Sequence, residues 1–219
     1  MKQKIIIKQN EAISFPDNKT KLLVEKAIKK VEDFFESKLD FEIIFLETRK
    51  EMDKIYSEMF GEEYKTEDWV VGGVFNEAVV YLFDEEVYDK VSCHPQETFF
   101  PTLIHEITHI FTKDLFNINI MWLNEGISYL VAEQDKVPLN KKEDLTKAYT
   151  EKEWMQTNPY LTAGKFTRYL FNRYGKEKMF KLLIKLSSKE TKKEFEETFF
   201  EIISEDFNLI WNSWFNKEE

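Results

Sequence analysis

Hydrophobic residues recur at helical spacing in the first long segment of the chain, from Thr20 to Ser37. The apolar positions in this segment are Leu23, Val24, Ala27, Ile28, Val31, Phe34 and Phe35. This spacing places them on one face of an amphipathic helix, and Asp17, Asn18 or Thr20 can serve as its N-cap. We therefore predict a helix over residues 20–37 that buries this face.

Short runs rich in β-branched and aromatic residues predict strands in the same part of the chain. Lys4–Lys8 and Phe41–Leu46 are the first two strand candidates. Val70–Phe83, with the sequence VVGGVFNEAVVYLF, predicts a hairpin whose turn would fall at Asn76-Glu77. Between these strands, Glu51–Phe60 is predicted to be a second helix.

Helical spacing dominates the chain from residue 98 onward. The predicted helices are Thr98–Lys113, Leu123–Gln134, Tyr160–Tyr174, Lys176–Leu186, Lys192–Ile203 and Phe207–Phe215. Because the strands come first and the helices follow them, rather than alternating with them, the predicted fold class is α+β. We expect a small mixed sheet with helices in residues 1–97 and a mostly helical part in residues 98–219. The Lys- and Glu-rich stretch 134–152 is predicted to be a mobile, solvated surface.

The composition permits a substantial core and argues against two kinds of partner. Of the 219 residues, 42% are hydrophobic and 16% are aromatic, which is typical of a globular protein. The formal net charge is −10, so nucleic-acid phosphates and anionic membrane surfaces would repel the chain. We therefore expect no nucleic acid and no membrane among its partners.

Cysteine content and hydropathy indicate where the protein works. Cys93 is the only cysteine, which excludes an internal disulfide and a metal site built from cysteines alone. The N-terminal apolar run is too short for a signal peptide, and no stretch approaches the roughly 18 apolar residues of a membrane span. These features lead us to expect a soluble, cytoplasmic protein.

The strongest candidate chemistry lies in the sequence HEITH, from His105 to His109. On a helix, residues four apart share a face, with Cβ atoms about 5–6 Å apart, so both imidazoles can reach one zinc ion. Glu106 lies about 100° round the helix from His105, where its carboxylate can act as general base toward a zinc-activated water. The plainer alternative is a buried helix that happens to contain two of the three histidines of the chain.

A two-histidine zinc site needs a third protein ligand. A third histidine at the spacing HExxHxxGxxH is absent from the chain. The best candidate is Glu125, within IMWLNEGISYL, near the start of a helix that would return antiparallel after a turn around Asn117 and Asn119. Glu133 and Asp114 are rival ligands.

These segments resemble those of the gluzincin zinc metallopeptidases, which include the thermolysin-like and the aminopeptidase-N-like enzymes. HEITH followed by WLNEG is similar to the two zinc-binding helices of that family. NPYLTAGKFTRYLFNRYGKEKMFKLL resembles a downstream region of small peptidases of the same superfamily. The resemblance covers about residues 70–214 and implies a thermolysin-like catalytic domain. In such a domain the two parts of the chain form one catalytic unit with zinc in the cleft between them.

The resemblance implies a role for each matched residue. His105, His109 and Glu125 would bind Zn2+, and Glu106 would activate the water. Tyr160 would donate a hydrogen bond to the developing oxyanion. The alternative donors are Tyr129, Tyr149, Arg168 and His94.

The predicted hairpin also gains a role from the resemblance. Gluzincins resemble one another in using an edge strand above the active-site helix to hold the peptide backbone. Gly72, Gly73, Val74 and Phe75 would form that strand and pair with substrate through main-chain hydrogen bonds, because glycine allows close backbone approach. A bulge in an ordinary hairpin is the alternative.

Three departures from the family pattern qualify the expected activity. The gap between His109 and Glu125 is shorter than in the best-known members, so the connecting loop must be tight. Tyr129 stands where thermolysin-like enzymes have an aspartate that orients a zinc histidine. Another group must therefore orient that histidine here. The aminopeptidase motif Gly-Ala-Met-Glu-Asn is missing, which favours an endopeptidase.

We therefore expect a zinc-dependent endopeptidase that cleaves peptide or protein substrates. The alternative is a regulatory or binding protein with a gluzincin fold and little or highly selective proteolytic activity. A metal-dependent hydrolase that acts on a substrate other than a peptide is a third possibility.

Overall fold

The computed structural model describes residues 3–8, 11–12, 18–61, 63–75, 78–139, 141–157, 159–189 and 191–216. The side chains at 3–8, 11–12, 18, 75 and 151 are outside this description. So are Asp17, one of the predicted N-caps, and the predicted hairpin turn at Asn76-Glu77. The chain forms two compact units, Met1–Phe111 and Thr112–Glu219, and each is described by itself.

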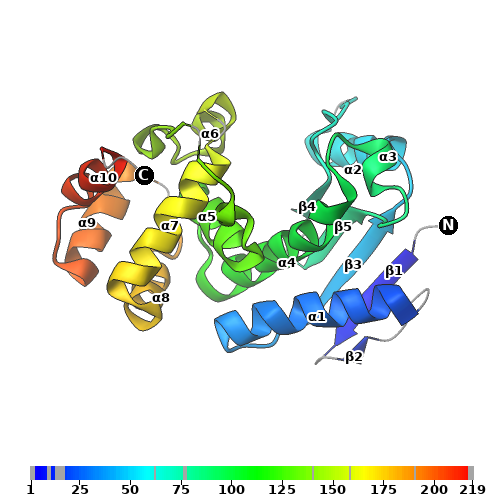
Figure 1. Cartoon of the computed structure of the whole chain (residues 1–219), viewed down its shortest axis with the longest axis horizontal. Helices are drawn as coiled ribbons and strands as arrows, with labels where there is room; N and C mark the ends of the chain where they lie inside the picture. The colour runs from blue at the N-terminus through cyan, green and yellow to red at the C-terminus, as the bar shows by residue number, and fades with distance from the viewer. Residues whose placement is uncertain are drawn as a thin grey trace. The chain divides into compact units, whose positions relative to one another are not determined.

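The first unit is built on a mixed sheet with the strand order β2-β1-β3-β5-β4 (Figure 1). Its strands are β1 (Gln3–Lys8), β2 (Glu11–Ala12), β3 (Phe41–Leu46), β4 (Gly72–Phe75) and β5 (Val79–Phe83). β3 and β5 are parallel, and the other neighbouring pairs are antiparallel. The strands expected at 4–8 and 41–46 and the hairpin are confirmed. β4 lies at one edge of the sheet.

The helices of the first unit are interspersed with its strands. They are α1 (Asn18–Phe35), α2 (Arg49–Phe60), α3 (Tyr88–Val91) and the first part of α4 (Phe99–Phe116), which continues across the division between the units. The α+β class is confirmed, and the two predicted helices of this half lie between its strands as expected. A parallel pair such as β3 and β5 needs a crossover connection, and α2 lies in that connection.

Aromatic side chains join the helices of the first unit to its sheet. The ring of Phe111, on α4, stacks on Phe35 of α1 at 5.4 Å and meets Phe41 of β3 edge-on at 6.3 Å. All three side chains are buried. The predicted apolar face of α1 is therefore confirmed, since Val24 and Val31 are also fully buried.

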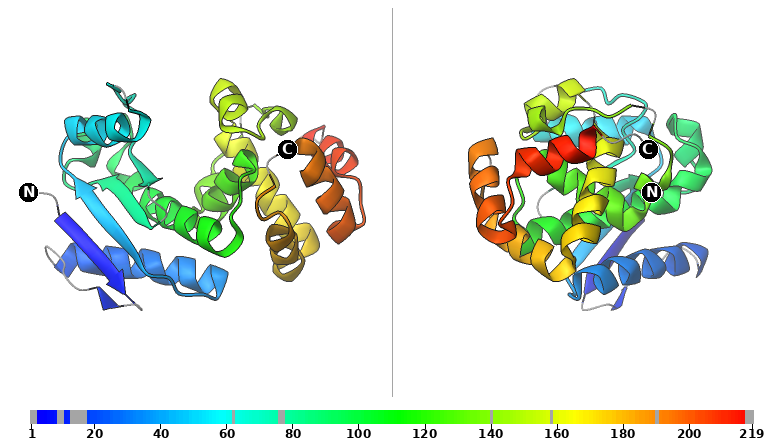
Figure 2. Two further views of the ribbon diagram at one scale, coloured as in Figure 1. Left: turned by 180° about the vertical axis from the view of Figure 1, so that it is seen from behind. Right: turned by 60° about the vertical axis from the view of Figure 1, so that its left-hand side comes forward.

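The second unit is helical in the part of the chain that the structure describes (Figure 2). Its helices are α5 (Met121–Ala132), α6 (Glu151–Thr157), α7 (Tyr160–Tyr174), α8 (Lys176–Lys185), α9 (Lys192–Ile203) and α10 (Phe207–Phe215). Trp122 lies at the centre of the core, with the rings of Phe166, Phe195 and Phe207 at 5.3–5.8 Å. All of the predicted helices in this half are found, and α6 is additional.

Helices α5 and α7 pack closely because glycine stands at their contact. A Cβ atom on Gly126 would lie 2.1 Å from Thr167 Oγ1 and 2.7 Å from the carbonyl oxygen of Ala163. A Cβ atom on Gly164 would lie 2.7 Å from the Cβ of Tyr129. All three distances are far inside normal van der Waals contact, so a side chain at either position would require neighbouring groups to shift.

The stretch 134–152, which was expected to be a solvated surface, is in part a packed segment. It contains the short 3-10 helices η2 (Gln134–Lys136) and η3 (Leu145–Lys147). Leu145, Ala148 and Tyr149 are buried. The expectation was wrong for these residues, because widely spaced apolar positions among many charges give no periodic signal.

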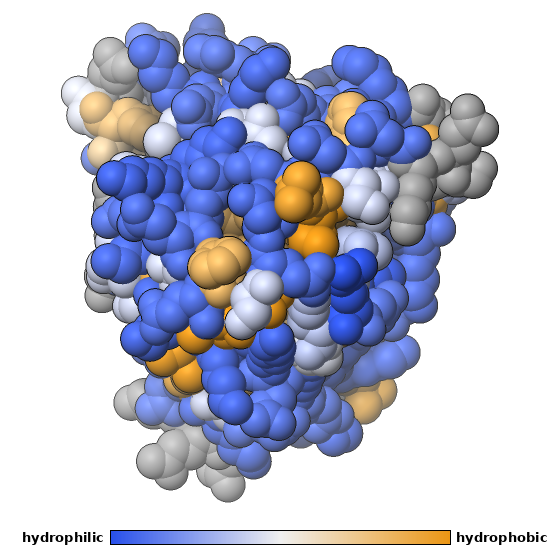
Figure 3. Space-filling view, turned by 90° about the vertical axis from the view of Figure 1, so that its left-hand side faces the viewer, coloured by the Kyte–Doolittle hydropathy of each residue, from blue (hydrophilic) through white to orange (hydrophobic). Residues whose placement is uncertain are grey.

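The exposed large apolar side chains are distributed over many elements. The most exposed are Leu209 at 69%, Leu22 at 67%, Ile184 and Phe200 at 61% and Met155 at 58%. Figure 3 shows one face of the molecule, which is mostly hydrophilic with separate apolar groups. Within the described ranges, no helix combines the length and the apolar character that crossing a membrane requires.

Candidate metal centre

His105 and His109 present their ring nitrogens to each other on one face of α4. Their Nε2 atoms are 3.0 Å apart, and their ring centroids are 4.7 Å apart. A tetrahedral zinc ion with bonds of about 2.0–2.1 Å would hold two nitrogens about 3.3 Å apart. A small adjustment of the two rings would therefore suit one ion. His105 is only 8% exposed, so little water competes for this position.

Glu125 completes a group of three potential ligands with the two histidines. One ligand atom from each of His105, His109 and Glu125 lies within 4.8 Å of the other two. Glu125 is 9% exposed. A buried carboxylate beside two imidazoles is a donor set that suits a divalent cation, because burial of a charged carboxylate is costly unless a positive charge compensates for it. This buried group can therefore bind a metal ion.

The connection between α4 and α5 is tight, as the short gap between the motifs requires. Asn117 has a φ of 47° and its N–H donates to the carbonyl of Lys113 at 2.9 Å, which closes α4. Residues 117–120 then suffice to reach the first residue of α5. The predicted turn around Asn117 is confirmed.

Two further sets of hydrogen bonds hold the first turn of α5. Thr112 Oγ1, on the last turns of α4, donates to Asn124 Oδ1 at 2.7 Å. The N–H groups of Met121 and Trp122 donate to the carbonyls of Tyr149 and Ala148 at 3.0 and 3.2 Å. These bonds fix the residues that flank Glu125, so the carboxylate is presented from a well-anchored helix start.

The rival ligands are placed elsewhere. Glu133 ends α5 in a left-handed conformation with a φ of 62° and pairs with Lys136 at 2.6 Å. Asp114 is exposed on α4. Neither residue belongs to the three-residue group.

Glu106 lies against the edge strand β4. A Cβ atom built on Gly72 would be 3.0 Å from Glu106 Cγ and 3.1 Å from its Cδ. Glu106 is 8% exposed and is not one of the three potential ligands. The structure therefore places the predicted base beside one of the residues predicted to bind substrate.

Tyr160, the predicted oxyanion donor, lies at the start of α7 within an aromatic cluster. Its ring stacks on Tyr129 at 5.7 Å and meets Trp154 edge-on at 4.7 Å. Burial, together with the nearby charge of Glu125, raises the pKa of the Tyr129 phenol, which keeps this hydroxyl protonated and able to donate. Tyr160 thus packs against Tyr129, whose phenol lies near the carboxylate of Glu125.

The other three candidate donors are engaged in structural contacts. Tyr149 is buried beside Trp122 and Phe195 in the core of the second unit. Arg168 binds the buried carboxylate of Asp135 and the carbonyl of Leu130. His94 Nε2 lies 2.9 Å from the carbonyl oxygen of Trp69. These contacts give each of the three residues a structural role.

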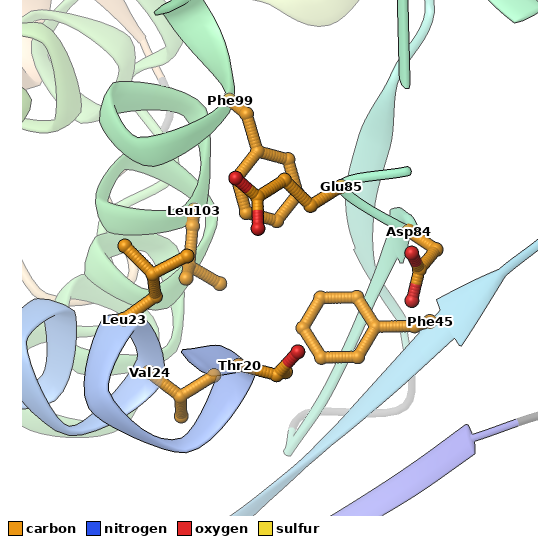
Figure 4. Close-up of a pocket in the computed structure, with 8 residues that line it drawn as sticks. All are labelled: Thr20, Leu23, Val24, Phe45, Asp84, Glu85, Phe99 and Leu103. Atoms are coloured by element: carbon orange, nitrogen blue, oxygen red, sulfur yellow. The ribbon is translucent and has the colours of Figure 1, made fainter. Parts of the chain in front are cut away.

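A separate pocket in the first unit contains none of the candidate site residues (Figure 4). Its lining residues are Thr20, Leu23, Val24, Phe45, Asp84, Glu85, Phe99 and Leu103. Apart from Asp84 and Glu85, which stand near one end of the pocket in Figure 4, the walls are mostly apolar. This pocket lies between α1, the sheet and α4.

Comparison with known proteins adds no assignment. No protein-family model matches the chain, and neither a curated protein nor a solved structure matches it significantly. The function must therefore be argued from the site itself.

Proposed function

We propose that this protein is a zinc-dependent metallopeptidase of the gluzincin type, with a thermolysin-like catalytic domain and endopeptidase activity. The observation that carries this proposal is the group formed by His105, His109 and Glu125, with Glu106 directly after the first histidine. Two imidazoles and a carboxylate are the ligand set of one class of catalytic zinc site, which leaves a position open for water or substrate.

Zinc at this group would supply a Lewis acid for the carbonyl oxygen and a water molecule of lowered pKa. The residues of the chain would supply the rest of the chemistry. The Glu106 carboxylate would accept a proton from the attacking water and pass it to the leaving amine nitrogen. Its low exposure favours this role, because a water-poor environment strengthens the interaction between a base and the proton that it takes.

Substrate would bind along β4. Gly72, Gly73, Val74 and Phe75 form an edge strand, and an extended peptide can add to such an edge by main-chain hydrogen bonds. The contact between Gly72 and Glu106 supports this arrangement, because it puts the base next to the strand that would hold the scissile peptide.

Tyr160 would donate its phenolic hydrogen to the oxygen on which negative charge develops. Its position against Tyr129 and Trp154 restrains the ring, and a preorganised donor of this kind is commonly worth about 10²–10³ in kcat. Tyr160→Phe removes only the hydroxyl and should lower kcat without changing zinc content.

Metal analysis of the purified protein tests the proposal. We expect close to one equivalent of zinc in the wild type after zinc is offered, and a strong loss in His109→Ala. Less than a tenth of an equivalent in the wild type would refute the proposal.

Glu106→Gln separates an enzyme from a binding protein. It should retain zinc and lose cleavage of a diverse peptide library by about 10²–10⁴-fold, because the amide cannot accept the proton. A wild-type protein that binds zinc but cleaves no peptide in the library would favour a regulatory protein or a hydrolase of another substrate class.

A further inference from the structure

Glycine at position 72 leaves a space that the Glu106 side chain fills. The Cβ of an alanine at this position would lie 3.0 Å from Glu106 Cγ and 3.1 Å from Glu106 Cδ. Carbon atoms normally approach to about 3.5–4.0 Å. An alanine at position 72 therefore requires a movement of strand β4, of helix α4, or of the side chain of Glu106 or Leu82, since Leu82 Cδ1 would also lie at 3.0 Å.

Strand β4 is held from its paired side. Gly72 pairs with Leu82 of β5, and the Cδ1 atom of Leu82 would also lie 3.0 Å from an added Cβ. Just before the strand, the carbonyl of Val71 accepts the N–H of Phe83 at 3.1 Å. The strand is thus fixed to β5 at and beside position 72.

Arg49 holds the chain that leads into β4. Its guanidinium group donates to the carbonyls of Glu67 and Asp68, each at 3.0 Å, and to those of Val70 and Val91. It also lies over the ring of Phe83 at 4.7 Å from the centroid. One side chain from the start of α2 therefore joins the approach to β4, the end of α3 and the last residue of β5.

Helix α4 is equally constrained. Leu103, Ile104, Ile107, Ile110 and Phe111 are all at most 1% exposed, so a shift of the helix would disturb a dense core. Of the two side chains that an added Cβ would meet, Leu82 is fully buried and Glu106 is 8% exposed, so we expect Glu106 to be the one that moves. A larger residue at 72 would therefore act mainly by displacing that side chain.

We infer that Gly72 is a positioning residue for Glu106: the missing side chain at position 72 sets where the Glu106 carboxylate lies against β4. The catalytic part of this inference rests on the proposed function, since it takes Glu106 as the general base. The steric part stands without it. Gly72 thereby couples the substrate strand to the base, in addition to its main-chain contact with substrate.

A double-mutant cycle on stability tests the steric part. The variants are Gly72→Ala, Glu106→Ala and the two combined, measured by urea unfolding in the presence of a chelator. We expect Gly72→Ala to lower the urea midpoint clearly in the wild-type background and by less than half as much in the Glu106→Ala background. Equal losses in the two backgrounds would overturn the inference.

Gly73→Ala in the same two backgrounds is the matched control. Successive residues of a strand face opposite sides of the sheet, so its effect on the urea midpoint should not depend on Glu106. If Gly72→Ala alone does not fold, a cooperative unfolding transition in the combined variant supports the inference. A combined variant that also does not fold contradicts it.

Kinetics of Gly72→Ala test the catalytic part. We expect zinc content equal to the wild type, a loss in kcat and a KM changed by less than about threefold, because a displaced base impairs the reaction rather than binding. A change confined to KM would contradict this part. If the proposed function is wrong, the wild type will bind no zinc or cleave no peptide. The effect of Gly72→Ala on the urea midpoint will then still depend on Glu106.

Discussion

Helices α4 and α5 contribute to the same group of potential ligands, but their ligands depend on different kinds of contact. On α4, His105 and His109 face each other because they stand four residues apart, and helix geometry alone brings their Nε2 atoms to 3.0 Å. On α5, Glu125 depends on its surroundings. Its helix start is held by Thr112 and by carbonyls of residues 148 and 149, and Gly126 lets α7 approach. A site of this kind combines a local pair with a third ligand that the rest of the fold supports.

The largest expected effect tests whether the two helices act on one ion. Zinc at 1,000 times its Kd should stabilise the wild type by about 4 kcal/mol, since it binds only the folded state strongly. His109→Ala and Glu125→Ala should each remove most of this gain, which urea unfolding with zinc and with chelator would measure. If Glu125→Ala kept the full gain, Glu125 would not be a ligand.

The close contact of α5 with α7 should give the next largest effect. Gly126→Ala would place a carbon 2.1 Å from Thr167 Oγ1 and 2.7 Å from the Ala163 carbonyl oxygen. We expect a loss of about 1–3 kcal/mol in the free energy of unfolding, together with weaker zinc binding, because the helix that carries Glu125 must shift. Thr167→Ala in the same chain should recover only part of the loss, as the Ala163 carbonyl remains. A variant as stable as the wild type would show that α7 moves away freely.

A smaller effect is expected at the hydrogen bond that joins the ends of the two helices. Thr112→Val keeps the shape of the side chain and removes the donor to Asn124 Oδ1. The free energy of unfolding should fall by about 1–2 kcal/mol, because a partly buried acceptor loses its donor. Zinc titration followed by calorimetry should show weaker binding than in the wild type. Thr108→Val, which removes only a bond to the carbonyl of Ile104 within α4, is the matched control for stability.

The N-cap of α9 is a purely local feature, so its loss should have the smallest effect on stability and no effect on metal binding. Thr191 caps α9 in a capping box with Glu194, far along the chain from both ligand helices. Thr191→Ala should cost about 1 kcal/mol in chemical unfolding, and the same amount with and without zinc. If the loss of stability depended on zinc, α9 would support the group of potential metal ligands. The contrast between the local histidine pair and the supported Glu125 would then be weaker.

Periodicity was sufficient to predict most of the elements and the local part of the site. The helices at 160–174, 192–203 and 207–215 are found at the predicted bounds, and β4 has the four residues expected of the edge strand. These segments are amphipathic or bounded by glycine, so each carries its own signal.

The parts that the sequence did not predict depend on contacts between distant residues. Leu145, Ala148 and Tyr149 are buried because they cover the start of α5, and nothing in their charged surroundings indicates this. The bond between Thr112 and Asn124 joins two polar residues that look like ordinary surface positions. The sequence does carry one signal for the glycine at 126. Small residues occur both in NEG, on the helix of Glu125, and in TAGKF, on the helix that packs against it, and two helices that approach closely both need small side chains.

All three potential ligands lie within residues 105–125, a short and continuous part of the chain. Closing a loop of this length costs little chain entropy, so a metal ion could draw these residues together before the strands of the sheet have paired. If the proposed metal binds, formation of its site would therefore not have to wait for the sheet.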